Sequence, residues 1–258
     1  MTLLEAIILG IIQGLAEFVP VSSSGHLLVF HHLFDIQAED NLTFIIVLNL
    51  GSLLPLLYTF RKDIIGLIKK PFQKLVYMLI IATIPIIVVT LLFEDFVTAA
   101  FQTTQFLAVG FLITGTLLIV ADKINTNSRE MKNLKYVDAI IIGLTQAVAL
   151  VPGISRSGTT ISASLFRGMT REDAAKFSFL MSIPTALGAI AFRVLRVFTG
   201  DILVTDLNFI NLFAGFVAAA ISGYLSINFM MRLIKGAKLK YFALFYVFGL
   251  AGVIFIFF

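Results

Sequence analysis

The stretch QGLAEFVPVSSSGH, residues 13–26, decides how this chain folds, because it returns in altered form 133 residues later. Residues 5–26 align without a gap with residues 138–159, and the matches include Gln13 with Gln146 and Ser22 with Ser155. Chance similarity between apolar helices would not retain glutamine and serine. The chain is therefore interpreted as an internal duplication in which two copies of one polar loop build a single site.

The composition is that of an integral membrane protein. Hydrophobic residues make up 59% of the chain and charged residues 13%, whereas charged residues make up about 25% of soluble domains. Both duplicated segments, residues 2–34 and 137–167, are interrupted by proline, glycine, serine and charged residues, which predicts re-entrant or broken helical hairpins. Apolar runs long enough to cross about 30 Å of hydrocarbon predict six further spans, at residues 42–60, 75–93, 106–121, 177–197, 209–231 and 241–258.

Several other protein classes are disfavoured. The N-terminal apolar stretch has no basic region before it and belongs to the repeat, so it is not expected to be a removable signal peptide. The chain has no cysteine, so disulfide and thiol chemistry are absent. The net charge of +4 comes from lysines and arginines in short loops beside apolar spans, which membrane orientation explains better than nucleic-acid binding. We therefore expect no nucleic-acid partner.

The loop charges predict the topology. The connections at residues 61–74, 123–135 and 232–240 are basic and should be cytoplasmic, whereas residues 94–105 and the region of Asp201 and Asp206 should lie outside. Arg193 and Arg196 fit this scheme less well. Each half has one hairpin and three spans, so the second half must enter the membrane upside down. The predicted fold is an all-α polytopic membrane protein with an inverted-topology repeat. Its parts are residues 1–121, a cytoplasmic linker at 122–136, and residues 137–258.

Gln13 and Glu17 lie four residues apart at the first hairpin tip, so their side chains should share one helical face. An ionisable side chain at the centre of a span costs about 2.5–3.5 kcal/mol on insertion scales, so Glu17 needs a cavity, a cation or a partner. A shallow hairpin would instead make it an interfacial carboxylate. Ser22, Ser23, Ser24 and Gly25 follow at a helix start, where hydroxyl and amide groups suit phosphate oxygens. The alternative is that these small residues only permit close helix packing.

The second tip adds a permanent cation, Arg156, to a similar group of polar residues: Ser155, Ser157, Gly158 and Thr160. Arginine can grip two phosphate oxygens at once, so a buried arginine among hydroxyl donors predicts an anion site. A purely structural bridge to Glu17 is the alternative. His26 follows Ser23 by three residues and is a candidate base or acid for its hydroxyl, with helix capping or packing as the alternative. His31 and His32 are expected to be interfacial residues without a role.

The duplication is broken where chemistry needs different groups, since Ser23 aligns with Arg156, Glu17 with Leu150, and His26 with Thr159.

On these motifs the chain resembles the undecaprenyl-diphosphate phosphatase family, also called bacitracin-resistance proteins. The family pattern (E/Q)xxxE matches Gln13 to Glu17, PVSSSGH matches residues 20–26, and PGxSRSxxT matches residues 152–160. The resemblance covers the whole chain.

The resemblance implies removal of the terminal phosphate from a C55 isoprenoid diphosphate, which recycles the lipid carrier for cell-wall synthesis and confers bacitracin resistance. It implies that Glu17 acts in catalysis or holds a divalent metal with Gln13 assisting, that Ser23 is the nucleophile, and that His26 is its acid or base. Arg156 would clamp phosphate. The remaining tip residues would bind substrate: Ser22, Ser24, Gly25, Ser155, Ser157, Gly158 and Thr160.

The same resemblance implies a multi-pass protein of the bacterial plasma membrane, with membrane lipid around it and a homodimer as its assembly. Mg²⁺ or Ca²⁺ would bridge diphosphate oxygens to Glu17, and the sequence contains no His/Cys set resembling a zinc site. Two other functions use the same features. A transporter or flippase would move a polyprenyl phosphate or another anion through the cavity, and a structural membrane subunit would tolerate apolar residues at Glu17 and Arg156.

Overall fold

The computed structural model of the chain describes residues 1–34, 36, 38–93, 96, 99–100, 104–124, 128–199, 208–236, 239–244, 249–252 and 254. Within these ranges every regular element is a helix, apart from an isolated bridge between Arg129 and Met169. The all-helical prediction is confirmed for this part of the chain. The last predicted span, residues 241–258, lies largely outside the described residues, as do the acidic residues expected in outer loops: Glu94, Asp95, Asp201 and Asp206.

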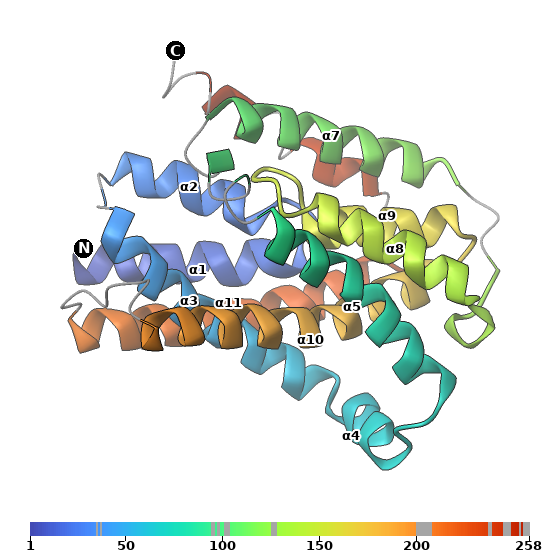
Figure 1. Cartoon of the computed structure of the whole chain (residues 1–258). Coiled ribbons are helices and arrows are strands. Elements are labelled where there is room, and N and C mark those ends of the chain that lie inside the picture. Colours follow the sequence, from blue (N-terminus) through green and yellow to red (C-terminus); the bar gives the residue numbers. More distant parts are fainter. Residues whose placement is uncertain are drawn as a thin grey trace.

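The helices follow one another in two similar series (Figure 1). The first series is α1 (Leu3–Phe18), α2 (Ser23–Leu33), α3 (Ala38–Thr59), α4 (Arg61–Lys69), α5 (Lys74–Leu92) and α7 (Thr104–Asp122). The second is η1 (Met131–Asn133), α8 (Tyr136–Val148), α9 (Arg156–Phe166), α10 (Arg171–Phe198), α11 (Phe209–Leu233) and η2 (Leu239–Phe242).

Three described helices, α5, α10 and α11, are long and apolar enough to cross a membrane. The pair formed by α3 and α4 would be a fourth span, although it bends by 76° where the two helices meet. The protein is therefore a multi-pass helical membrane protein. Helices α7 and α8 are shorter apolar helices, and the count of six spans stays a prediction.

The duplication is visible in the helix boundaries. An offset of 133 residues relates both ends of α2 to both ends of α9, and it also relates the first residue of α1 to that of α8. The second helix of each hairpin begins in the same way. The Ser22 hydroxyl accepts from the Gly25 amide at 3.3 Å, and the Ser155 hydroxyl accepts from the Gly158 amide at 3.1 Å. Serine is a preferred residue at a helix start because its oxygen satisfies an otherwise free amide.

The packing of the helices repeats as well. Helix α1 packs on α11, and α8, the counterpart of α1, packs on α5. At the first contact Gly10 lies so close to Gly215 that a Cβ added to Gly10 would be 2.4 Å from the Gly215 carbonyl oxygen. At the second, a Cβ on Gly143 would be 2.5 Å from the Ala82 carbonyl oxygen. The 133-residue offset relates Gly10 to Gly143 and Ala82 to Gly215. Both contacts use small residues to bring backbones together, as membrane helices commonly do.

A larger residue at Gly14 should therefore weaken the first contact. An added Cβ would lie 2.1 Å from the Ser222 Oγ and 2.4 Å from the Ala219 carbonyl oxygen, so α1 and α11 would have to separate. We expect Gly14→Ala to lower the free energy of unfolding by about 1–3 kcal/mol. Gly188→Ala in α10 is the matched control, since an added Cβ there meets nothing within 4 Å. Thermal unfolding in detergent checks both variants, and an unchanged Gly14→Ala protein would contradict the tight packing.

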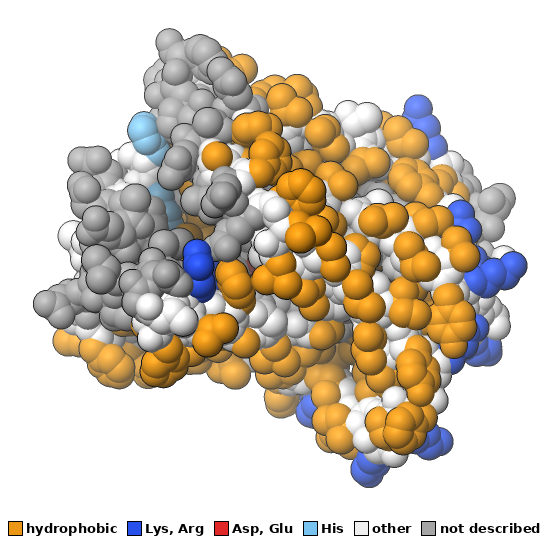
Figure 2. Space-filling view, viewed as in Figure 1, with side chains coloured by type: hydrophobic (Ala, Val, Ile, Leu, Met, Phe, Trp, Pro, Cys, Tyr) orange, Lys and Arg blue, Asp and Glu red, His pale blue; other side chains and the backbone are white. Residues whose placement is uncertain are grey.

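The two hairpins enter the bundle from opposite ends, and their turns face each other in the interior (Figure 1). The α1–α2 hairpin occupies the end near the N-terminus, and α8–α9 occupies the other. Figure 2 shows a broad apolar surface whose lysines and arginines gather mostly at the second end, near α4 and the segment before α8. Charged side chains at one end of an apolar bundle are typical of the side that faces the cytoplasm.

Candidate active site

Glu17 and Arg156 meet in the interior and form an ion pair between the two hairpins. Glu17 lies in the last turn of α1, and Arg156 is the first residue of α9, so each side chain stands beside the turn of its own hairpin. The side chains are 16% and 24% exposed, respectively. A pair of opposite charges removes the cost that either would bear alone in an apolar bundle, and it leaves a small accessible surface at which a ligand can compete.

The second carboxylate oxygen of Glu17 is held by two neutral donors. The Ser23 hydroxyl donates to Oε2 at 2.8 Å, and the Gln13 amide donates to the same oxygen at 3.2 Å. Gln13 is 1% exposed and also donates to the Asn49 Oδ1 at 2.9 Å, with the Ser52 hydroxyl at 3.4 Å. Glu17 therefore accepts from three side chains, Arg156, Ser23 and Gln13, and Gln13 is itself anchored to α3.

Ser23 and His26 hydrogen-bond to different partners. Ser23 donates to Glu17, whereas the His26 Nδ1 lies 2.8 Å from the Ser22 carbonyl oxygen. Only a protonated Nδ1 can make that contact, so in a neutral ring Nε2 is the nitrogen without a proton. The cause is helical spacing, since residue 26 stands one turn after residue 22. The ring also packs edge-on against Phe111, with 5.7 Å between the centroids.

Ser22 has an unusual backbone conformation, with φ 63° and ψ 91°. Its counterpart in the second hairpin, Ser155, has an ordinary φ of −76°. A non-glycine residue in this region costs on the order of 1–3 kcal/mol and persists only where the surroundings enforce it, which is often at functional sites. The strain turns the chain directly before Ser23, so that the Ser23 hydroxyl reaches Glu17.

The second tip is tied both to the first tip and to the helix behind it. The Ser157 hydroxyl donates to the Val19 carbonyl at 3.4 Å and lies 3.2 Å from the Ser155 hydroxyl. The Ser155 amide donates to Thr114 at 3.0 Å. Thr160, in contrast, is fully buried, and its hydroxyl is shared between the Arg156 carbonyl at 2.7 Å and Ser178 at 2.6 Å. In this state Thr160 supports α9 from behind and presents no atom to a ligand.

Three supporting residues were missed by the sequence analysis: Asn49 and Ser52 on α3, and Ser178 on α10. The signal was available, because each is a polar residue inside an apolar run, and such residues usually face the bundle interior. Asn49 and Ser52 are also three residues apart, which places them on one helical face.

The donor set limits how a metal could bind. The described residues contain no group of three or more His, Cys, Asp or Glu side chains that could hold an ion. Glu17 is the carboxylate around which the two tips meet, and the oxygens near it belong to neutral amides and hydroxyls. This set fits a hard cation that takes most of its ligands from water or from a phosphate group.

The fold and the site together define a class: a multi-pass helical membrane protein with an internal polar site, made by two facing hairpins, in which a carboxylate, a guanidinium and hydroxyls surround one point. Comparison with known families gives the particular one. Residues 6–253 match the family model described as bacitracin resistance protein BacA, and the chain belongs to this family.

Curated relatives carry related names. An undecaprenyl-diphosphatase of Alkaliphilus metalliredigens is 41% identical over 264 residues, which cover 94% of each chain. Undecaprenyl-diphosphatase 3 of Bacillus cereus is 44% identical over 250 residues, covering 97% of this chain and 95% of the relative. An undecaprenyl-diphosphatase of Methanobrevibacter smithii is 40% identical over 264 residues, covering 94% of this chain and 93% of the relative.

Proposed function

We propose that this protein is a membrane phosphatase that hydrolyses undecaprenyl diphosphate to undecaprenyl phosphate and inorganic phosphate. One observation carries the proposal: the Ser23 hydroxyl lies 2.8 Å from the Glu17 carboxylate, which is paired with Arg156 from the opposite hairpin. Nucleophile, base and phosphate-binding cation are thus together. The names of the relatives specify the substrate. The product is a lipid carrier for cell-wall precursors, and its recycling underlies bacitracin resistance.

The architecture suits a substrate with a long polyprenyl tail. The proposed arrangement is an inverted repeat in the plasma membrane, supported by the facing hairpins and by the reciprocal contacts of α1 with α11 and α8 with α5 (Figure 1). The diphosphate enters the polar site between the hairpins while the tail stays in the bilayer, so the enzyme never has to extract it. The homodimer remains a prediction.

Arg156 exchanges partners during binding. In the free protein it neutralises Glu17. The terminal phosphate then takes the guanidinium, whose planar fork suits two phosphate oxygens. Ser157, Ser24 and the first amides of α9 lie at the same two tips and supply further donors. This exchange both positions the phosphorus near Ser23 and frees an oxygen of Glu17.

The proposed reaction has two steps. Ser23 Oγ attacks the terminal phosphorus, its proton passes to Glu17, and the bond from that phosphorus to the bridging oxygen breaks to release undecaprenyl phosphate. Glu17 loses that proton to solvent and then deprotonates a water molecule, which attacks the phosphorus of the phosphoserine. The bond from phosphorus to Ser23 Oγ breaks, the proton on Glu17 passes to that oxygen, and inorganic phosphate is released with Ser23 restored. His26 is assigned to protonate the departing bridging oxygen through its Nε2.

A divalent cation, Mg²⁺ or Ca²⁺, is proposed as the cofactor, with Glu17 as its protein ligand and diphosphate oxygens completing much of its coordination. When bound, it would withdraw charge from the phosphate oxygens and so stabilise the transition state. The protein's own residues supply the rest: Ser23 is the nucleophile, Arg156 orients the substrate, and Glu17 and His26 move protons.

Release of phosphate tests the proposed function. We expect purified protein in detergent to release inorganic phosphate from undecaprenyl diphosphate, and also from the shorter farnesyl diphosphate, because the site contacts only the head group. A flippase of the same fold would release none. The control is protein carrying Arg156→Ala, purified in the same way. The phosphate that this variant releases measures the background from contaminating phosphatases. If the protein moved a labelled polyprenyl phosphate across vesicle membranes and released no phosphate, the phosphatase proposal would be wrong and a transporter would take its place.

A further inference from the structure

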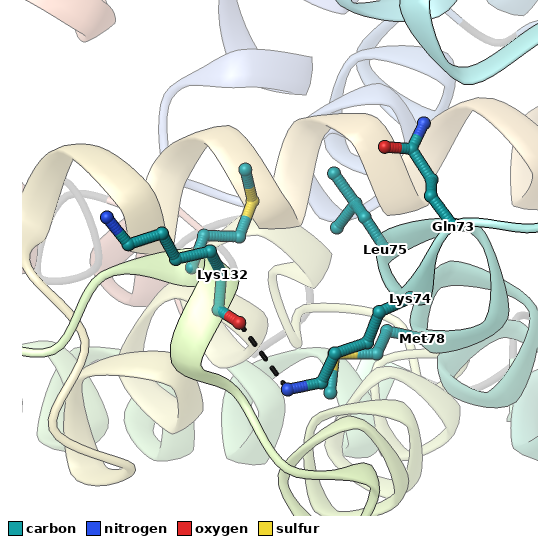
Figure 3. A pocket seen from close by; sticks show the side chains of 6 residues that line it. Gln73, Lys74, Leu75, Met78 and Lys132 are labelled. Carbon is teal, nitrogen blue, oxygen red and sulfur yellow. Dashed lines mark hydrogen bonds between the residues drawn. The ribbon is translucent and has the colours of Figure 1, made fainter. Parts of the chain in front are cut away.

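A pocket of about 310 Å³ lies far from the two hairpin tips, between the first turn of α5 and the segment before α8 (Figure 3). Its lining combines two lysines with apolar side chains: Gln73, Lys74, Leu75, Met78, Met131 and Lys132. The proposed mechanism uses none of them. The pocket lies between the first half of the duplication and the linker, since α5 belongs to the first half and η1 lies in the linker.

The two lysines give the rim a positive charge. The Lys74 ammonium reaches across the pocket and donates to the Lys132 carbonyl at 3.4 Å (Figure 3). Among the described residues no carboxylate pairs with Lys74. Lys132 pairs with Glu130 at 2.5 Å, and this hydrogen bond and charge raise the pKa of Lys132 above its ordinary value. One carboxylate, that of Glu130, thus faces two lysines at this rim.

The apolar part of the pocket is made by Leu75, Met78 and Met131, and Met78 is only 1% exposed. A charged rim above an apolar floor matches an amphiphile better than a free ion. Gln73, the residue at the start of α5, donates its side chain to the Gly66 carbonyl at 3.3 Å and does not cap the helix. The helix start thus adds to the positive potential of the rim.

The depth of the pocket matches that of lipid head groups. Helix α5 is a candidate span that begins at Lys74, so its first turn lies at the edge of the hydrocarbon. Helix α4, which precedes α5 and is bent by 76° from α3, exposes Ile65 and Ile68 together with basic residues. An amphipathic helix of this kind lies in the membrane interface. The basic loops place this edge on the cytoplasmic side.

We propose that this pocket binds an anionic phospholipid of the cytoplasmic leaflet. The lipid phosphate binds the Lys74 ammonium, and the first methylene groups of its chains lie on Leu75, Met78 and Met131. The Lys132 ammonium extends to the other side and keeps its pair with Glu130, so it adds charge to the rim without holding the phosphate directly (Figure 3). Basic pockets between membrane helices on the cytoplasmic side bind anionic head groups in this manner. A bound lipid links the linker to α5, and it adds to the contact by which the Asp173 carboxylate accepts from the Met131 amide at 2.7 Å.

The test measures lipid binding by delipidated full-length protein. Phosphatidylglycerol is titrated in native mass spectrometry, with phosphatidylcholine as the zwitterionic comparison. We expect one tight phosphatidylglycerol site whose affinity falls about tenfold in Lys74→Ala/Lys132→Ala, since both cations contribute to it. Thermal unfolding in nanodiscs supplies a second measurement, because phosphatidylglycerol should raise the melting temperature of the unaltered protein and raise that of the variant less.

The matched control is Lys62→Ala/Lys123→Ala, which removes the same charge from exposed positions at the same end of the protein. It should keep the tight site. Equal loss in both double variants would mean general surface attraction and would overturn the proposal. So would equal binding of phosphatidylcholine, unchanged phosphatidylglycerol binding in Lys74→Ala/Lys132→Ala, or displacement of the lipid by inorganic phosphate at similar concentration, which would make the pocket a phosphate site.

Discussion

Arg156→Ala is expected to lower kcat/KM for undecaprenyl diphosphate by about 10³-fold, because arginines that stabilise a transferring phosphoryl group contribute 10³ to 10⁵. The guanidinium already lies at the meeting point of the hairpins, held by Glu17. Arg156→Lys should recover only part of the loss, since an ammonium keeps the charge but cannot bind two oxygens in one plane. Phosphate release by purified variants measures both.

Arg156→Ala also leaves the Glu17 carboxylate without its cation, so the variant's loss of stability has to be distinguished from its loss of catalytic rate. Loss of one member of a buried pair can cost 3–5 kcal/mol. Arg167→Ala is the control, because it removes one of the two arginines that pair with another buried carboxylate, Asp138, to which the Arg167 Nε donates at 2.7 Å. That control should lose stability and retain kcat. Full turnover by Arg156→Ala would contradict the proposed site.

Glu17→Gln should reduce kcat by about 10²- to 10⁴-fold, the range typical of a lost general base. The amide keeps the size of the side chain and can still accept from Ser23 and contact Gln13, so the local packing is preserved while the proton acceptor is lost. Glu172→Gln is the control, since that carboxylate pairs with Lys235 at 2.9 Å at the start of α10, away from the site. The kcat is measured under saturating substrate.

A double variant distinguishes a catalytic Glu17 from a structural one. If Glu17 activates Ser23, then adding Ser23→Ala to Glu17→Gln should reduce the rate little further, because both changes disable one step. If the Glu17 and Arg156 pair is only a bridge, replacing both by apolar residues should leave turnover intact and raise the melting temperature. That outcome would support the structural-subunit alternative.

The general organisation was predictable because it is encoded locally. The duplicated motif at residues 13–26 predicted paired hairpins, and the structure starts α2 and α9 with the same serine cap. Composition predicted a multi-pass helical protein, and the motifs predicted that Glu17 and Arg156 belong to one site, where they form an ion pair. The span count and the residues after 244 are not tested by the described helices.

The partners within the site were not predictable from spacing. Sequence suggested His26 as the partner of Ser23, but the chain turns at Ser22 through a left-handed conformation, so that Ser23 meets Glu17 and His26 turns back to the Ser22 carbonyl. Thr160 matches the motif but is buried against Ser178. Asn49 and Ser52 carry no motif, although they hold Gln13 in place.

The sequence by itself therefore determined the membrane class, the duplication and the set of reactive groups, because hydropathy, repeated residues and side-chain chemistry are properties of the chain alone. The tertiary structure decided which oxygen accepts from which donor, and it placed a lysine-lined pocket between α5 and η1. A hydrogen bond forms only when donor and acceptor lie within about 3.5 Å. That distance depends on how closely segments far apart in sequence approach, as Gly10 does to Gly215, and only the packed bundle sets it.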